Sequence, residues 1–582
     1  MEFTSVNKLF EAAFKKNWVR PAISNYQGET LCFRDVARRM EKLHIMFEEC
    51  GLEKGHKVAI CSRNQANWAV SFLATMTYGA VPVPLLHEFK SANIHHLVNH
   101  SEAKILFVDD VIWEGLSESE MPDVQAIIQV NNFKILYAAD EKIYDAKEHL
   151  NELFGRKYPE AFEADMLNYY EDSADELAVI NYTSGTSGFS KGVMIPYRAI
   201  LSNIQFGKKA LPQLDGSSRV VSMLPCAHMY GLMFEVLYEL SVGCHVHFLS
   251  RLPSPKIIMK ALSEVKPSVV IAVPLVIEKI YKSKVKPILE KEGIKFLMKV
   301  PGLNQVVLNK VREELINAFG GEFYEVIIGG AAFNKEVEAF FKKMNFPFTV
   351  GYGMTECAPI ITYDDWKEEK LYSCGKAAPN MEIRIASKDP VNVPGEIQIK
   401  GANVFLGYYK NEEATAEVFT EDGWFRTGDM GVLDEDGCLF IKGRTKCMIL
   451  GPSGQNIYPE EVETVINSQP YVVDSLVIED DGGLTALIYP EEVETVINSQ
   501  PYVVDSLVVE DNGGLTALIY PNFQQGAKDG MNQDAFIKYM EGTLSDLNKE
   551  LPNYAKLKKI EVMSEDFERT PKKSIKRYLY QR

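Results

Sequence analysis

Short apolar segments alternate with amphipathic stretches along the first two thirds of the chain. Residues 57–61, 104–108 and 124–130 are dominated by apolar side chains over the length of a strand. Residues 66–78 have the length and pattern of a helix, and Gly79 follows them as a residue type that commonly ends helices. This alternation predicts an α/β fold in which helices cover layers of parallel strands.

Three later apolar segments, 269–273, 324–328 and 348–350, each run into a loop that contains proline or glycine. In open parallel sheets, ligands bind at the carboxyl ends of the strands. We therefore expect the loops that follow these segments to line one crevice.

The composition changes late in the chain. Residues 395–401 and 437–444 have the pattern of short antiparallel strands with tight turns. Glycine and proline then become frequent between 443 and 454, which predicts a domain boundary. We expect a large N-terminal domain, 1–443, built of α/β-layered subdomains and a short β-rich portion, and a small α+β domain, 444–582.

The small domain contains a 31-residue unit twice in tandem. Residues 457–487 and 488–518 are identical at all but two positions. Each copy has the pattern of a helix, a strand, a tight turn and a second strand. Two units are too few for a repeat solenoid. A recent duplication or an error in the recorded sequence explains the near identity better than a second binding module does. We expect one copy to complete the small domain and the other to lie outside it or on a sheet edge.

The composition is that of an ordinary globular protein, and the charge and cysteine pattern argue against some classes of function. A formal net charge of −18 argues against a nucleic-acid partner, and nine scattered cysteines without a Cys-x-x-Cys pair point to reduced thiols. No segment resembles a signal peptide or a membrane span, so we predict a cytoplasmic protein. His95, His96 and His100 lack partners at metal-ligand spacing and are expected to form an ordinary helix face. The sequence leaves open the oligomeric state and peripheral contact with a membrane.

The most specific chemical signal lies in residues 182–194. An apolar segment, 177–182, leads directly into hydroxyl residues and glycines around Lys191. Glycine lets the backbone approach an anion, amides and hydroxyls donate hydrogen bonds, and lysine supplies positive charge. The stretch therefore predicts a phosphate-binding loop, with a spacing that differs from that of the common nucleotide-binding loop.

Four further motifs follow in a fixed order. Residues 352–356 place an aromatic ring, a hydroxyl and a carboxylate on one loop, and these groups suit a purine, a phosphate and Mg²⁺. Residues 424–429 end in an aspartate that suits the two hydroxyls of a ribose. Residues 443–446 lie at the predicted boundary, and residues 570–577 form a lysine-dense segment near the C-terminus. Their joint occurrence says more than any one of them.

With these motifs the chain resembles the adenylate-forming (ANL) superfamily over nearly its whole length. Residues 224–231 and the tail around 570–577 are most similar to bacterial long-chain fatty acid–CoA ligases (acyl-CoA synthetases). The resemblance implies that a carboxylate attacks the α-phosphate of Mg²⁺-bound ATP, giving acyl-AMP and pyrophosphate. The thiol of coenzyme A then attacks the acyl carbon and releases AMP. It also implies that the small domain is mobile, with a hinge at Lys446, so that one site serves both reactions.

The resemblance also assigns roles to individual residues. Thr183, His228 and Glu356 would take part in catalysis. Thr183 and Glu356 would also bind Mg²⁺, and His228 would border the acyl pocket. The residues implied to bind ATP are Thr183, Ser184, Gly185, Thr186, Ser187, Gly188, Lys191, Gly329, Gly330, Ala331, Tyr352, Gly353, Thr355, Asp429 and Arg444.

One position departs from the family pattern. The family's C-terminal catalytic lysine stands directly before an aliphatic residue, whereas Ser574 precedes Ile575 here. Lys572 and Lys573 come just before, and lysine has a long flexible stem. We predict that Lys573 is the catalytic lysine that bridges the carboxylate and the α-phosphate; without such a shift, adenylation is slowed.

The sequence thus favours an ATP-dependent fatty acid–CoA ligase whose partners are small molecules: the fatty acid, ATP and coenzyme A. Two alternatives remain open within the ligases, namely an acyl-[carrier protein] ligase and a CoA ligase for aryl or other acids. A catalytically impaired protein that only binds an acyl group or a nucleotide is the third. The chain length of the acid is not readable from the sequence.

Overall fold

The chain divides into two compact units, Met1–Ile441 and Lys442–Arg582, which we describe separately. The sequence placed the boundary two residues later. In the computed structural model, the described residues are 4–183, 191–250, 255–289, 291–300, 302–445, 449–450, 456–457, 459, 462–463, 466, 472–480, 483–490, 497, 502–511, 514–550, 557–565, 567–568 and 579–580.

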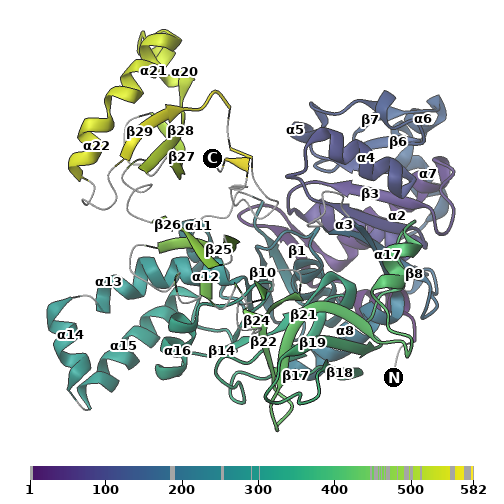
Figure 1. Cartoon of the computed structure of the whole chain (residues 1–582). Coiled ribbons are helices and arrows are strands. Elements are labelled where there is room, and N and C mark those ends of the chain that lie inside the picture. Colours follow the sequence, from purple (N-terminus) through teal and green to yellow (C-terminus); the bar gives the residue numbers. More distant parts are fainter. Residues whose placement is uncertain are drawn as a thin grey trace. The chain divides into compact units, whose positions relative to one another are not determined.

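Residues 57–138 of the first unit contribute a five-stranded sheet, coloured purple to blue in Figure 1. Its order is β4 (Val81–Leu85), β3 (Lys57–Cys61), β5 (Ala103–Val108), β6 (Ala126–Gln129) and β7 (Ile135–Ala138). The first four strands are parallel and β7 is antiparallel. Alternate side chains enter different cores, because successive residues of a strand point to opposite faces. Val58 and Ile60 join a cluster with α2 (Phe33–Glu49) and α3 (Ala66–Tyr78), whereas Ala59 and Cys61 join one with α4 (Ser91–Ser101).

Two smaller parallel sheets complete the α/β part of this unit. One has the order β10 (Arg219–Ser222), β11 (His245–Phe248) and β1 (Pro21–Asn25), with β2 (Thr30–Cys32) antiparallel at its edge. The other consists of β12 (Val270–Ala272), β13 (Val326–Ile328) and β14 (Phe348–Val350). Helices α11 (Pro255–Val265), α15 (Leu303–Ala318) and α16 (Lys335–Lys343) pack against it around a separate core. The predicted α/β class is confirmed.

The remaining strands of the first unit are largely antiparallel. Strand β8 (Leu177–Thr183) pairs with β9 (Lys191–Pro196), and β9 also pairs with β20 (Gly407–Tyr408). Strands β18 (Met381–Ala386), β19 (Gly395–Gly401), β21 (Phe425–Leu433) and β22 (Leu439–Arg444) form the predicted β-rich portion. The predicted phosphate loop therefore joins two antiparallel strands, a pairing that the apolar pattern did not indicate.

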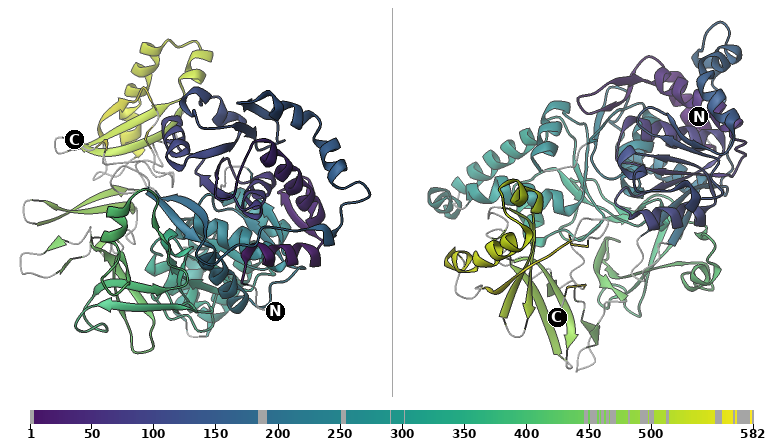
Figure 2. Two further views of the ribbon diagram at one scale, coloured as in Figure 1. Left: turned by 90° about the vertical axis from the view of Figure 1, so that its right-hand side faces the viewer. Right: turned by 90° about the horizontal axis from the view of Figure 1, so that it is seen from above.

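The second unit contains both copies of the repeat, and the two copies differ in the strands with which they pair (Figures 1 and 2). In the second copy, β27 (Val503–Asp511) and β28 (Gly514–Pro521) form a hairpin, and β28 also pairs with β29 (Leu557–Val562). Their side chains share a core with α21 (Gln533–Gly542) and α22 (Leu544–Glu550). In the first copy, β25 (Val472–Asp480) and β26 (Gly483–Pro490) form a two-stranded sheet that includes no other described strand.

Equivalent residues of the two copies show the same difference. Ile497 of the second copy is fully buried in the core of the small unit, whereas its counterpart Ile466 is only half-buried. The second copy therefore contributes to the core of this unit.

Candidate active site

Strands β8 and β9 place two predicted phosphate ligands side by side. Thr183 ends β8, Lys191 begins β9, and the two residues are direct partners across the ladder. The predicted loop residues Ser184, Gly185, Thr186, Ser187 and Gly188 lie outside the described residues. The two residues lie at the loop end of the hairpin, and as direct partners they place a hydroxyl and an ammonium group on the same face of the ladder.

Lys191 and Glu356 are linked by a tyrosine that the sequence analysis did not select. The Lys191 ammonium lies 4.6 Å from the centroid of the Tyr408 ring, within the range of a cation–π contact. The Tyr408 hydroxyl donates a hydrogen bond of 2.9 Å to Oε1 of Glu356. Pairing of β20 with β9 holds the Tyr408 backbone opposite Val193, which brings residues more than 200 positions apart in the sequence into one cluster.

Glu356 lies in a tight turn between β15 (Tyr352–Gly353) and β16 (Ile360–Tyr363). Its backbone carbonyl accepts a hydrogen bond from Phe405, and its side chain is 8% exposed. Burial raises the pKa of this carboxyl, while the Tyr408 hydrogen bond and the Lys191 charge act in the opposite direction. A buried carboxylate that faces a cation and one hydroxyl donor is suited to a divalent cation brought in by phosphates.

The turn also requires glycine at position 353, which is one of the predicted site residues. A Cβ atom at Gly353 would collide with the carbonyl oxygen of Pro359. Thr355 begins the single 3₁₀ turn that contains Glu356. The loop therefore holds Thr355 and Glu356 at successive positions of the same 3₁₀ turn.

Tyr352 and Asp429 form a second pair of contacting residues in this site. The Tyr352 hydroxyl donates a 2.5 Å hydrogen bond to Oδ2 of Asp429, which lies on β21. The Asp429 amide donates to Oγ1 of Thr427, and the Thr427 hydroxyl donates to the carbonyl of Ile397. Burial and the adjacent carboxylate raise the pKa of Tyr352 far above its ordinary value, so the phenol remains a donor.

The glycine-rich segment after β13 lies against an aromatic ring. A Cβ atom at Gly329 would lie 3.3 Å from Tyr230, whose hydroxyl donates to the carbonyl of Ile327. Gly330 has a φ of +86°, a conformation that side chains rarely adopt, and Ala331 is exposed. The segment thus presents backbone and one small side chain at the end of a parallel strand.

His228 lies where a loop meets helix α9, and buried polar side chains hold this loop in place. It precedes α9 (Met229–Leu232), and Asn181 donates to the carbonyl of its neighbour Ala227. The fully buried Glu235 accepts hydrogen bonds from the amides of Met223 and Leu224. Asn181 and Glu235 are supporting residues that the sequence analysis missed, because a polar residue in an apolar stretch gives no signal of its partner.

The three remaining predicted residues belong to the second unit. Arg444 is exposed at the end of β22. The predicted hinge Lys446 and the predicted catalytic Lys573 lie outside the described residues.

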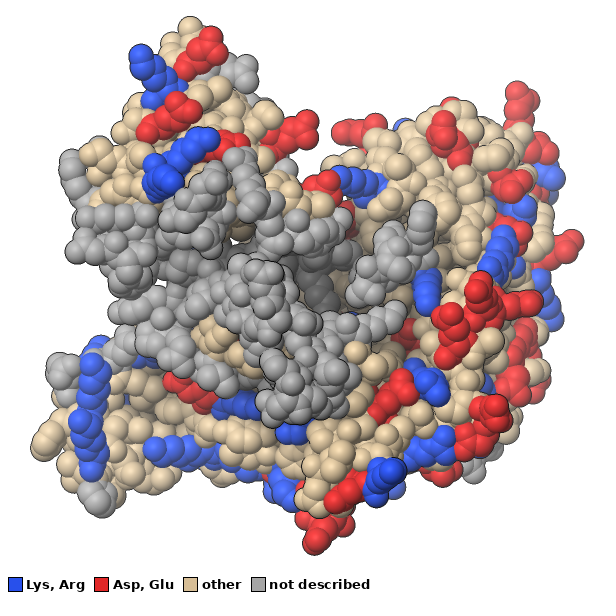
Figure 3. Space-filling model, in the orientation of Figure 1, with Lys and Arg blue, Asp and Glu red and all other residues tan. Residues whose placement is uncertain are grey.

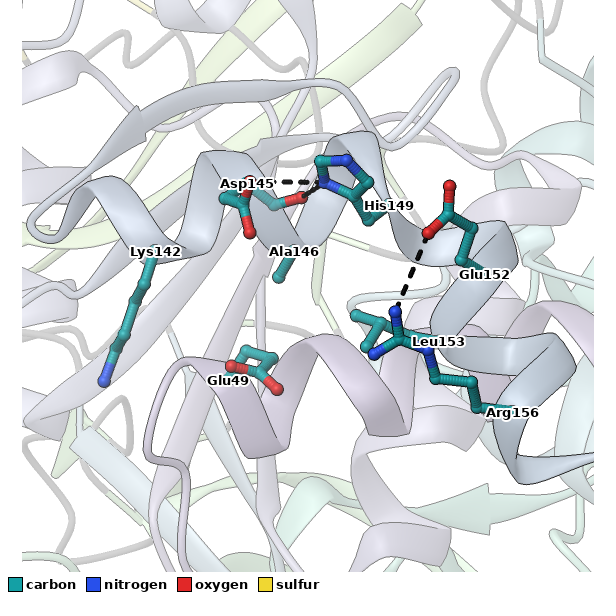
Figure 4. Close-up of a pocket in the computed structure, with 8 residues that line it drawn as sticks. All are labelled: Glu49, Lys142, Asp145, Ala146, His149, Glu152, Leu153 and Arg156. Atoms are coloured by element: carbon teal, nitrogen blue, oxygen red, sulfur yellow. Dashed lines mark hydrogen bonds and ion pairs between the residues drawn. The ribbon is translucent and has the colours of Figure 1, made fainter.

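One surface hollow is lined by none of the residues of this cluster. It has a volume of about 380 Å³ and lies between α2, α6 (Glu141–Glu148) and α7 (Leu150–Lys157), as Figure 4 shows. Its charged groups pair with one another, for example His149 with Asp145 and Arg156 with Glu152. None of the predicted site residues lines it, and we assign it no role.

The described residues form no ready-made cluster of metal ligands. Within the described ranges, no group of three or more His, Cys, Asp or Glu side chains could hold a metal ion. Mg²⁺ commonly binds through one or two carboxylates together with substrate phosphates, and Glu356 beside Lys191 fits that mode. None of the described helices is long and apolar enough to cross a membrane.

Sequence profiles place the chain in a family. The profile of the AMP-binding enzyme family matches residues 10–409, which include the described site residues from Thr183 to Tyr408. The chain belongs to the AMP-binding enzyme family. The profile of the C-terminal domain of AMP-binding enzymes matches residues 485–582, which contain the whole second copy of the repeat. The predicted membership of the adenylate-forming superfamily is therefore confirmed.

The individual relatives have low sequence identity to this chain but match most of its length. The human long-chain-fatty-acid–CoA ligase ACSBG2 is 26% identical over 508 residues, which cover 82% of this chain and 73% of that protein. The long-chain-fatty-acid–CoA ligase FadD15 of Mycobacterium tuberculosis is 27% identical over 458 residues, covering 74% and 72%.

Solved structures share the fold. ATP-bound MatB from Rhodopseudomonas palustris has a TM-score of 0.66 and 22% identity, and the match covers 99% of this chain and 98% of that one. The o-succinylbenzoate–CoA synthetase MenE of Bacillus subtilis, in complex with an acyl-adenylate intermediate, has a TM-score of 0.64 and 21% identity, with coverage of 98% and 97%. The chain is thus an adenylate-forming enzyme with the two-part fold of this family.

Proposed function

We propose that the protein joins a long-chain fatty acid to coenzyme A through an acyl-AMP intermediate, releasing AMP and pyrophosphate. The observation that carries this proposal is the convergence of three distant motifs. Tyr408 links Lys191 to Glu356, and Tyr352 contacts Asp429, so the groups suited to phosphate, metal, purine and ribose form one continuous cluster.

The first half-reaction brings two anions together, so the site must reduce their repulsion. Lys191 and the hydroxyl of Thr183 would bind the β- and γ-phosphates, Asp429 would hold the ribose hydroxyls, and the Tyr352 ring would face the adenine. Mg²⁺, held by Glu356 and the phosphates, would supply further charge neutralisation. The acid's carboxylate oxygen then attacks the α-phosphorus, and the bond to the pyrophosphate oxygen breaks.

The second half-reaction uses the same acyl group. The sulfur of coenzyme A attacks the acyl carbon, and AMP leaves with the electron pair of the acyl–phosphate bond. Residues 1–443 would supply the ATP and acyl sites, and residues 444–582 would swing about Lys446 between the two reactions. Lys573 would bridge the carboxylate and the α-phosphate during the first reaction only.

Support for a long-chain acid comes from the relatives, several of which are named long-chain-fatty-acid–CoA ligases. By its title, the fold neighbour MenE acts on a different acid, o-succinylbenzoate. An aryl or other acid, and a carrier-protein thiol in place of coenzyme A, are therefore the competing assignments. We place the enzyme in the cytoplasm because its substrates ATP and coenzyme A are found there.

The assignment is tested by measuring thioester formation with ATP and Mg²⁺ over acids from acetate to stearate, plus benzoate. Each acid is offered coenzyme A or a phosphopantetheinylated carrier protein. The proposal expects acyl-CoA as the product, with the highest kcat/KM for long chains. A preference for benzoate would change the acid, and thioester on the carrier protein alone would change the acceptor.

A further inference from the structure

Helices between residues 274 and 310 present a lysine-rich face on the first unit. The elements are α12 (Pro274–Ile280), the π-helix Tyr281–Val285, α13 (Lys286–Leu289), α14 (Glu292–Lys299) and the start of α15. This segment contains eight lysines and three glutamates in a chain whose net charge is −18. In Figure 3, Lys and Arg side chains gather at the lower left, over the helices labelled α13, α14 and α15 in Figure 1.

These helices are held on the protein by their opposite faces. In α14, Ile294, Leu297 and Met298 recur at helical spacing and pack against the core around β12–β14. In α15, Val307, Leu308 and Val311 are buried in the same core. The lysines therefore project from helices whose orientation is fixed by apolar packing.

Large apolar side chains stand among the exposed lysines. Phe296 is 68% exposed, and it lies on the outer side of α14 with Lys299 three residues further on. Val306 is 63% exposed on the outer side of α15, four residues before Lys310. Leu275 and Leu303 are also exposed. Exposed apolar side chains that cluster in this way commonly mark an interaction surface.

The glutamates of the segment offset only part of its positive charge, because three glutamates stand against eight lysines. One of them, Glu278, is half-buried and accepts a hydrogen bond from the amide of Asn334. The exposed Glu313 and Glu314 lie one turn beyond Lys310 on α15. The combination of outward lysines with an aromatic and aliphatic anchor suits an anionic lipid surface, where ammonium groups meet headgroups and apolar groups enter the interface.

We propose that this lysine-rich face, residues 274–310, docks the enzyme on an anionic bilayer surface. Docking does not depend on the ligase assignment, although a surface of this kind would bring the enzyme to acids dissolved in a bilayer. The protein would lie on the membrane without crossing it, which agrees with the lack of a spanning helix among the described residues.

Sedimentation of the full-length protein with vesicles tests the proposal. Phosphatidylcholine vesicles with and without phosphatidylglycerol are compared at low and high salt. The wild type is expected to bind only the anionic vesicles, and less tightly as salt rises. Phe296→Ser is expected to weaken binding roughly tenfold at both salt concentrations. Lys291→Gln/Lys299→Gln is expected to weaken it by at least about tenfold at low salt and by less at high salt.

Matched controls separate this face from charge and hydrophobicity in general. Val111→Ser removes an equally exposed apolar group elsewhere, and Lys134→Gln/Lys388→Gln removes two exposed lysines elsewhere. Both are expected to bind vesicles like the wild type, and all variants should share its melting temperature because the changed side chains are exposed.

Absence of wild-type binding, equal binding to neutral vesicles, or equal losses in the controls would each overturn the proposal. Capture of an acidic carrier protein by this face, with no vesicle binding, would overturn it in favour of a protein partner. Thioester formation from a long-chain acid delivered on albumin is measured in parallel without vesicles. Absence of that activity in the wild type, with vesicle binding retained, would refute the proposed function and leave the docking surface standing.

Discussion

The hydroxyl of Tyr352 donates a 2.5 Å hydrogen bond to Oδ2 of Asp429, 77 residues further along the chain. The residue proposed to face adenine and the residue proposed to hold ribose are therefore positioned by each other. The two residues proposed to recognise the nucleoside thus come from two different sheets.

Asp429→Ala is expected to weaken ATP binding by roughly 10- to 100-fold, because hydrogen bonds to a carboxylate are among the stronger ones. The loss should be specific to the ribose. We therefore compare ATP with 2′,3′-dideoxy-ATP in equilibrium binding, in the wild type and the variant. The wild type should prefer ATP, and the variant should bind both alike. A variant that still prefers ATP would show that another group recognises the ribose hydroxyls.

Tyr408→Phe is expected to lower the apparent Mg²⁺ affinity of the ATP complex by roughly tenfold, the usual effect of losing a partner of a metal-binding carboxylate. Because the ring that faces Lys191 remains, ATP binding in the presence of a chelator should be unchanged. Titration of Mg²⁺ into the protein with ATP, followed by calorimetry, measures both quantities. Tyr409→Phe is the control, since the neighbouring hydroxyl donates to Glu102 instead. Equal Mg²⁺ affinity in the wild type and Tyr408→Phe would rule out this role.

Lys573→Ala is expected to abolish acid-dependent formation of acyl-AMP and to leave thioester formation from supplied acyl-AMP intact. The reason is that the bridging charge acts only while the carboxylate attacks the phosphate. Lys572→Ala is the matched control and should retain adenylation. Unchanged adenylation in Lys573→Ala, with loss in Lys572→Ala, would move the role by one residue.

Glu239→Gln is expected to flatten the pH dependence of stability. Glu239, on α10 (Tyr238–Val242), is fully buried, and neither carboxylate oxygen has a hydrogen-bond partner among the described residues. Burial raises its pKa from 4.5 to about 8. The folded state therefore binds an extra proton between these values, so stability present at low pH is lost as the pH rises towards 8. The loss is on the order of 4 kcal/mol between pH 5 and 8.

Thermal unfolding of the wild type and Glu239→Gln at pH 5 and pH 8 measures this effect. The melting temperatures of the two proteins should differ more at pH 8 than at pH 5, with the variant the more stable at pH 8. The exposed Glu314→Gln should follow the wild type. Parallel curves for the wild type and Glu239→Gln would show that Glu239 does not titrate in this range.

Deletion of residues 457–487 is expected to leave a folded and active enzyme. The second copy contributes Ile497 and β27–β28 to the core of the small unit and can remain in place. Hydrogen exchange on the full chain should show slower exchange in the second copy. Peptides containing Ile478 and Asp481 differ in mass from those containing Val509 and Asn512, so the copies are distinguishable. Equal protection of both would refute the expectation that only one copy completes the domain.

The strands that could be predicted from the sequence are those with continuous apolar runs. Residues 57–61 and 348–350 are strands with the predicted bounds, and 66–78 is the predicted helix, closed by Gly79 in a left-handed conformation. Such segments are recognisable because burial on both faces demands apolar side chains at successive positions.

Pairings between distant segments could not be predicted in the same way. Nothing in residues 407–408 indicates that they join β9, and so nothing singled out Tyr408. The role of Phe296 depends on which side of α14 meets the core, and a phenylalanine in an apolar stretch is more commonly buried. Motifs could identify the residues suited to ATP, but the contacts that connect them required the fold.

Isotope exchange between pyrophosphate and ATP tests the central claim most directly, because it reports acyl-AMP formation without the thiol. With Mg²⁺ and a long-chain acid, the wild type is expected to exchange label, and omission of the acid should abolish the exchange. Glu356→Gln should reduce it strongly at unchanged melting temperature. Exchange that proceeds equally without acid, or equally in Glu356→Gln, would contradict an acid-adenylating site built around Lys191, Tyr408 and Glu356.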